Sequence, residues 1–117
     1  MKLLSLFLLL VSFNSQASLY CALGQKTPSE HISSLPYATV QIDALQTNQI
    51  QAYLTDYYGE TDSNTIFNLS EKSNLQINNF ETGTYLDEKS HATAQLKYQS
   101  GKIIFVMNKK SYTCEIL

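Results

Sequence analysis

The sequence predicts an all-β domain of about eight short antiparallel strands, arranged as a meander that forms a closed barrel or a two-layer sandwich. Three observations support this fold class. Several short segments alternate apolar and polar residues, which is the period of a strand with two different faces. The chain has eight tyrosines, no tryptophan and many Ser, Thr, Asn and Gln residues, a composition that suits pleated surfaces. Its two cysteines lie near the two ends of the predicted domain.

The N-terminal segment has the features of a secretory signal peptide. Lys2 precedes a mainly apolar run from Leu3 to Phe13, and the small residues Ser15 and Ala17 follow it. That run covers 11 residues, fewer than the roughly 20 that a membrane-spanning helix requires. We therefore predict a cleaved signal peptide over residues 1–17, a single domain over residues 18–117, no membrane span, and a periplasmic or extracellular location.

Cys21 and Cys114 are the only cysteines, so an oxidising compartment offers them one intramolecular pairing. A bond between them closes a loop of about 90 residues, which the chain-entropy model values at roughly 4 to 5 kcal/mol. A redox or metal role is disfavoured because the chain has no C-x-x-C motif and no Cys/His cluster. Lipidation of Cys21 is an alternative. The pattern of lipoprotein processing, however, has a small residue directly before the lipidated cysteine, and this chain has Tyr20 there.

The first half of the domain begins with a predicted strand over Ser18–Leu23, ended by Gly24. Thr27 to Glu30 match a capping box with proline at the first helical position, and Pro36 follows closely. This pattern predicts one or two turns of helix over Pro28–Ser34.

The next strand is the clearest, because residues 38–44 alternate strictly between apolar and polar side chains. Residues 48–58 fit two patterns. Ile50, Ala52 and Leu54 alternate as in a strand, whereas Ile50, Leu54 and the tyrosines between 53 and 58 also form a helical stripe ending at Gly59. We favour a hairpin with residues 46–48 as its turn and keep the helix as the alternative.

The later strands are short, rich in β-branched or aromatic residues, and bounded by Asn, Ser or Gly. Tight turns are predicted at Ser100–Gly101 and at residues 108–110. A disulfide between the first and last strands fits a closed barrel, which has no free edges, and also a sandwich. The predicted strands are Thr65–Ser70, Leu75–Phe80, Ala92–Gln99, Lys102–Asn108 and Ser111–Ile116.

The charge balance excludes one class of partner. Without Lys2 the chain carries seven lysines and no arginine against ten acidic residues, a net charge of −3. Nucleic-acid binding requires clustered cations, so we expect no nucleic-acid partner. We interpret Lys102, Lys109 and Lys110 in the last hairpins as a solvated face or a guarded strand edge. No cofactor motif is present, and we expect no cofactor.

The densest group of aromatic and acidic residues is the candidate binding site. Tyrosine offers a large contact area with a polar tip and is enriched at interfaces, so we expect this group to suit a basic protein partner. The alternative is that some of its rings cover one end of the barrel. The group comprises Tyr53, Asp56, Tyr57, Tyr58, Glu60 and Asp62.

Two other patterns in the sequence could indicate a catalytic or a metal-binding site: the two histidines and a spacing similar to that of an EF-hand loop. His31 and His91 are both predicted to lie in loops, and no nucleophile motif accompanies either of them. The oxygen-bearing residues from Glu60 to Glu71 follow EF-hand spacing in part, but Thr65 replaces the required glycine and no helices flank the segment. We therefore predict neither a catalytic set nor a metal site.

The function favoured by these residues is an exported binding or inhibitor-type module that acts through surface loops. In layout the chain resembles the small periplasmic inhibitors of lysozyme, which are also short disulfide-bridged β domains. That resemblance implies a lysozyme as partner, but it assigns no residue of this chain to a functional position. The alternatives are a small periplasmic hydrolase that uses His31 or His91 and a barrel that encloses a small apolar ligand.

Overall fold

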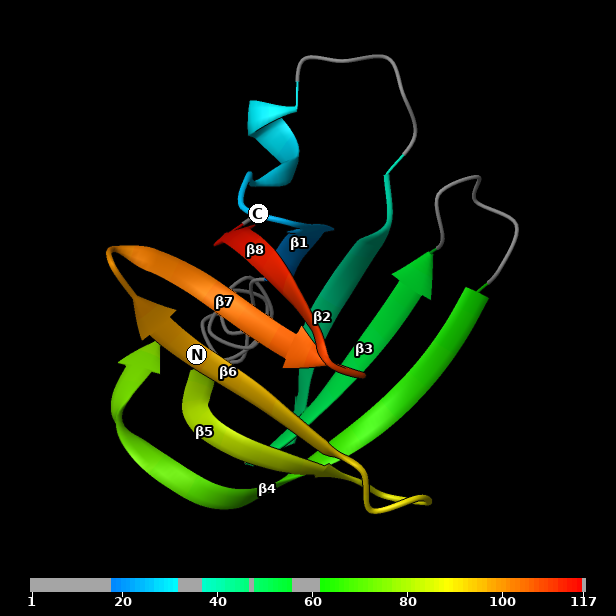
Figure 1. The fold of residues 1–117 in the computed structure, drawn as a ribbon. Helices are drawn as coiled ribbons and strands as arrows, with labels where there is room; N and C mark the ends of the chain where they lie inside the picture. Colours follow the sequence, from blue (N-terminus) through cyan, green and yellow to red (C-terminus); the bar gives the residue numbers. More distant parts are fainter. Residues whose placement is uncertain (1–17, 32–36, 47, 56–61, 117) are drawn as a thin grey trace, which may run out of the picture.

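The computed structural model describes residues 18–31, 37–46, 48–55 and 62–116, and for Asp62 the backbone only. The predicted signal peptide lies outside these ranges. Eight strands form a closed antiparallel barrel in which each strand pairs with the next and β8 returns to β1 (Figure 1). The closed barrel is thus confirmed over the sandwich. The strands are β1 Leu19–Leu23, β2 Thr39–Gln46, β3 Gln49–Thr55, β4 Asp62–Ile77, β5 Phe80–Asp87, β6 Thr93–Gln99, β7 Lys102–Met107 and β8 Lys110–Ile116.

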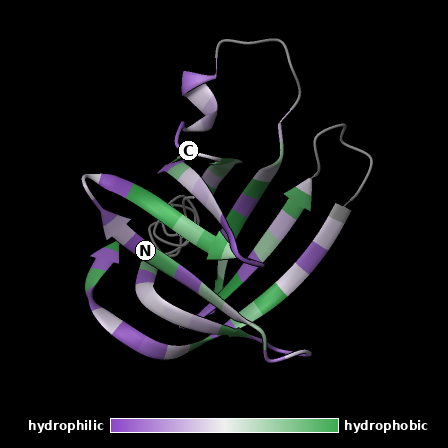
Figure 2. Ribbon diagram, in the orientation of Figure 1, coloured by the Kyte–Doolittle hydropathy of each residue, from purple (hydrophilic) through white to green (hydrophobic). Residues whose placement is uncertain are grey.

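The core fills the barrel because alternate residues of each strand point inward. Residues 103, 105 and 107 of β7 are buried, whereas 104 and 106 are half-buried on the outside. Phe67 and Phe105 meet edge to face inside the barrel, with their ring centroids 6.1 Å apart. Figure 2 shows that β7 is largely apolar, whereas the end of β4 that leads into β5 is largely polar.

Cys21 and Cys114 form a disulfide at the seam where the first and last strands meet. The two residues are directly opposite each other on β1 and β8, with their Cα atoms 3.9 Å apart. The bond therefore closes the barrel covalently between strands that lie 93 residues apart in the sequence. The predicted pairing is confirmed.

A single turn of 3-10 helix, η2, spans Pro28–Glu30 and lies against the outside of this seam (Figure 1). The Ser29 amide and hydroxyl both donate to the carboxylate of Glu115, at 2.9 and 2.6 Å. The hydroxyl of Thr113 donates to the Gly24 carbonyl at 2.6 Å. These contacts explain why Thr113 is buried although it is on the outer side of β8. The predicted helix is confirmed as this one turn, and residues 32–36 lie outside the described ranges.

The hairpin of β2 and β3 is confirmed over the helical alternative for residues 49–55. Asn48 turns the chain with φ of 66°. Ser100 and Gly101 turn β6 into β7, and Asn108 and Lys109 turn β7 into β8, all four with positive φ. Asparagine and glycine tolerate this conformation well, which is why such residues marked the turns in the sequence.

The division of residues 65–87 into strands was predicted wrongly. The two strands expected at Thr65–Ser70 and Leu75–Phe80 belong mainly to one long strand, β4, and a separate strand, β5, follows over Phe80–Asp87. Residues 70–76 of β4 are all exposed, so they carry no alternation that would show a continuous strand. The pairing of β4 with β5 also shifts register twice, between Leu69 and Glu71 and between Lys72 and Gln76.

Gly83 allows β5 to follow this irregular strand. Its φ is 146°, and a Cβ atom placed there would lie 2.1 Å from the Glu71 carbonyl oxygen. Beside it the buried hydroxyl of Thr82 donates to the Leu75 carbonyl at 2.5 Å. The only helix in the described ranges is η2, and none there is long or apolar enough to cross a membrane.

Candidate functional site

The structure describes only two of the six residues of the predicted binding group, Tyr53 and the backbone of Asp62. Tyr53 lies on β3 with 39% of its surface exposed, and Asp62 is the first residue of β4. Thr55 pairs with Asp62, so the two strands lie side by side where they approach the connecting segment. The remaining four members, Asp56, Tyr57, Tyr58 and Glu60, lie outside the described residues.

Tyr53 is held by a chain of side-chain hydrogen bonds across β3 and β4. Its hydroxyl donates to Gln51 Oε1 at 2.7 Å, and Gln51 Nε2 donates to Asn64 Oδ1 at 2.8 Å. One step along the same two strands, Gln49 Nε2 donates to Asn68 Oδ1 at 3.0 Å. An exposed ring anchored in such a network keeps one orientation better than a free surface tyrosine does.

A second group of side-chain hydrogen bonds lies on the neighbouring strand β2. Asp43 pairs with Gln51, and its Oδ1 accepts from the Gln41 amide at 3.2 Å and from the Ser18 hydroxyl at 2.5 Å. The outer side of three neighbouring strands therefore presents amides, one carboxylate and one phenol. We call this surface the amide face, and it consists of Gln41, Asp43, Gln49, Gln51, Tyr53, Asn64 and Asn68.

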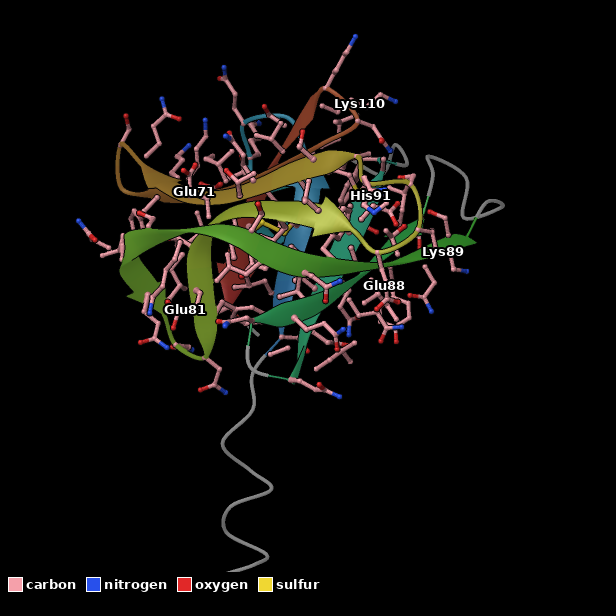
Figure 3. All side chains as sticks on the ribbon, turned by 90° about the horizontal axis from the view of Figure 1, so that it is seen from below. Glu71, Glu81, Glu88, Lys89, His91 and Lys110 are labelled. Carbon is pink, nitrogen blue, oxygen red and sulfur yellow. A yellow bond between two sulfur atoms is a disulfide. The ribbon has the colours of Figure 1, made fainter. Side chains whose placement is uncertain are left out.

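A hollow of about 230 Å³ lies beside the amide face, between β4 and the turn that joins β5 to β6. Asn64 and Ile66 line one side, and Asp87, Glu88 and Lys89 line the other. The amide of Glu88 donates to the Ile66 carbonyl at 2.9 Å and holds the turn against β4. Figure 3 shows Glu88 and Lys89 together at this turn.

Asp87 keeps its negative charge at the edge of that hollow. Its Oδ1 accepts hydrogen bonds from the backbone amides of Lys89 and Ser90, at 2.8 and 3.4 Å. The bond from Lys89 is the main cause that lowers the pKa of Asp87 below its usual value, and Ser90 adds to it. The carboxylate is therefore ionised at neutral pH.

Charges are segregated between two sides of the barrel. Residues 27–71, which include β2, β3 and the first part of β4, contain six acidic residues and no lysine. Residues 89–114, which include β6 and β7, contain five lysines and no acidic residue. β3 and β7 are four strands apart in either direction around the barrel. The amide face thus lies on strand segments without a lysine, and Lys89 lines the hollow beside it.

The two histidines do not form a catalytic set among the described residues. His31 stacks on Tyr37, with ring centroids 3.9 Å apart, and its Nε2 is buried without a hydrogen-bond partner in the described ranges. His91 is exposed in the β5–β6 turn with φ of 62°. No described Ser, Asp or Glu side chain bonds to either imidazole, so the site offers no support for a hydrolase.

The described residues also lack a metal-binding arrangement and a roomy interior. No group of three His, Cys, Asp or Glu side chains in the described ranges could hold a metal ion. The residues of the EF-hand-like pattern that the structure describes lie along the extended strand β4 and do not wrap around a centre. Large buried side chains, including Phe80, Tyr85 and Phe105, occupy the barrel interior. The candidate site is therefore on the outer surface.

Sequence reasoning identified Tyr53 but not its partners. Gln49, Gln51 and Tyr53 are spaced by two, which places them on one side of β3. Asn64 was considered only as an oxygen ligand of a loop, because the segment before residue 65 was not predicted as a strand, and Asn68 lay in the predicted strand Thr65–Ser70 without an assigned partner strand. The missing information was the β3–β4 register, which pairs Tyr53 with Asn64 and Gln49 with Asn68.

Comparison of the chain with protein-family models, with curated proteins and with solved structures finds no match.

Proposed function

We propose that this chain is an exported binding module that captures a protein partner through the amide face and the segment joining β3 to β4. The observation that carries the proposal is Tyr53, which is 39% exposed and yet fixed through Gln51 to Asn64. A rigid exposed aromatic ring loses little conformational entropy when a partner covers it. The side-chain amides around the ring can both donate and accept hydrogen bonds, which supplies directional contacts at the edge of an interface.

The charge of this side supports a basic partner. Asp43, Asp87 and Glu88 lie on or beside the amide face, and the residues from 27 to 71 add no cation. Acidic residues 56, 60 and 62 follow Tyr53 in the chain and carry the same sign. Complementary charge steers encounter and suppresses partners of the wrong sign.

Lysozymes are the first partners to test, because they are commonly basic and the chain resembles their small periplasmic inhibitors in layout. A disulfide-closed barrel supports that choice, and it also supports an oxidising location outside the cytoplasm. A rigid scaffold that presents the amide face suits inhibition by blocking a cleft.

The test measures binding by titration calorimetry and inhibition of cell-wall hydrolysis, with a panel of basic lysozymes. Replacing a central tyrosine of an interface costs about 2 kcal/mol, so Tyr53→Ala should weaken binding about 30-fold. The matched control is Tyr98→Ala, which removes a ring that is 50% exposed on β6, away from the amide face. That control should bind as the original chain does.

A second variant tests the adjoining segment, with Tyr57, Tyr58, Glu60 and Asp62 all changed to alanine.

If no lysozyme binds to the original chain at micromolar concentration, lysozyme is rejected as partner. Affinity capture from envelope and extracellular extracts then decides the wider proposal. A partner retained equally by the original chain, by Tyr53→Ala and by the segment variant would reject this surface as the binding site.

A further inference from the structure

The side of the barrel opposite the amide face has its own surface features. Lys97 is half-buried on β6, Lys102 is exposed at the start of β7, and Lys109 and Lys110 are exposed at the β7–β8 turn. Glu115, at the edge of this side, uses its carboxylate to accept from Ser29. Within the described residues none of these lysines forms an ion pair, but the Lys102 ammonium donates to the Gln25 carbonyl at 3.1 Å and interacts electrostatically with Glu30.

Two hollows lie along the outside of β6 and β7. The larger, of about 540 Å³, is lined by Thr84, Thr93, Gln95, Val106, Asn108 and Lys109. The smaller, of about 260 Å³, is lined by Gln25, Gln99, Ser100, Lys102, Ile104 and Thr113. Each hollow thus combines hydroxyl or amide groups with one β-branched apolar side chain and one lysine.

The strand register places the two hollows in line. Thr84, Gln95 and Val106 stand opposite one another across β5, β6 and β7, in the larger hollow. Ile104, two residues from Val106 on the same side of β7, belongs to the smaller hollow and is opposite Lys97. At about 3.3 Å per residue, the outer side of β7 from Lys102 to Val106 spans about 13 Å. The two hollows thus lie one after the other along the outer side of β7, with Lys97 beside them on β6, and we call this surface the lysine groove.

We propose that the lysine groove binds a linear acidic polysaccharide whose sugar rings carry carboxylates. Lys97, Lys102 and Lys109 supply point charges for carboxylates without the fixed fork of arginine. Thr84, Thr93, Gln95 and Asn108 supply donors and acceptors for hydroxyl groups. Val106 and Ile104 offer apolar surface to the carbon-bound faces of sugar rings. This inference is independent of the proposed function, because it concerns the opposite side of the barrel.

The form of the groove favours a polysaccharide over an anionic membrane. A lipid surface is flat and cannot follow the hollows, whereas a single polymer chain can enter both. The hydroxyl and amide lining provides hydrogen-bond partners for the hydroxyl groups of such a chain. Nucleic acid would require a denser array of cations than these lysines provide.

The experiment uses the purified chain with polygalacturonate, with uncharged dextran, and with vesicles that contain phosphatidylglycerol. Binding is followed by calorimetry and co-sedimentation at about 10 mM and about 1 M salt, between which the Debye length falls from about 30 Å to about 3 Å. We expect binding to polygalacturonate that is lost at high salt, and none to dextran. Binding to the vesicles but not to the polymer would overturn the proposal in favour of a membrane surface.

Charge-matched variants locate the site. Lys97→Gln combined with Lys109→Gln should weaken polygalacturonate binding about tenfold, since two exposed charge pairs are removed. Gln95→Glu, which places a carboxylate in the larger hollow, should weaken it further. The control combines Lys72→Gln with Lys89→Gln and has the same net charge, but its substitutions lie outside the groove. Equal losses in the control and the groove variants, or no binding by the original chain, would overturn the proposal.

Discussion

Replacing Gly83 with alanine should be among the most damaging single changes in this barrel. The added Cβ would lie 2.1 Å from the Glu71 carbonyl oxygen and 3.1 Å from the Lys72 Cα, both in the backbone of the neighbouring strand. Neither atom can move without disturbing the β4–β5 pairing. Overpacking typically costs about 1 to 3 kcal/mol, and a positive φ adds about 1 to 2 kcal/mol for a residue with a side chain.

We therefore expect Gly83→Ala to lower the free energy of unfolding by about 2 to 5 kcal/mol, a large part of the 5 to 15 kcal/mol typical of a domain. The measurement is equilibrium urea unfolding of the oxidised chain, followed by tyrosine fluorescence. Gly101→Ala is the matched control, because Gly101 also has positive φ, at 78°, but has no atom within 4 Å of the added Cβ. It should lose only about 1 kcal/mol. If both variants lose the same amount, contact with Glu71 is not what requires glycine at position 83.

Three further predictions concern the seam and the core. Replacing Cys21 and Cys114 together with serine should lower the free energy of unfolding by about 4 kcal/mol in the same assay, because a loop spanning 93 residues is released; an unchanged urea midpoint would contradict this. Burial raises the pKa of Tyr85 from 10.0 to about 12, so its contribution to stability is complete below pH 10 and is lost as the pH rises through 12. Unfolding measured between pH 9 and pH 12.5 should show a smaller alkaline decline for Tyr85→Phe than for the original chain, and parallel curves would refute the assignment. Glu115→Ala removes the acceptor of both Ser29 bonds, so amide hydrogen exchange at residues 29–31 should become about tenfold faster, while exchange in β3 stays unchanged; an unchanged rate at residues 29–31 would mean that other contacts hold η2.

The strands that sequence predicted well are those with one buried and one exposed side. Residues 38–44 alternate because β2 has the core on one side and solvent on the other. The ambiguity was resolved for residues 49–55 by tertiary pairing, since Ala52 stands opposite the buried Ile42 of β2 and Ile50 opposite the half-buried Ala44. A single sequence contains no direct information on such a partner strand.

Prediction failed where the barrel itself bends. Residues 70–76 leave the core entirely, and the second register shift separates Lys72 from Gln76 while their partners are Gly83 and Glu81. Bulges of this kind remove the period of two that identifies a strand. In the fold Gly83 is the residue that lets β5 approach the bend closely.

The same register that hides part of the fold from the sequence also creates the two candidate surfaces. Within the described residues a single ion pair, Lys72 with Glu81 at 3.7 Å, joins opposite charges. The meander places β2 and β3, which carry no lysine, and β6 and β7, which carry no acidic residue, on opposite sides of a closed barrel. Closure at the Cys21–Cys114 seam fixes that separation, since no strand can exchange neighbours. A chain with a net charge of only −2 over its whole length can therefore present one surface suited to a basic partner and another suited to an acidic one.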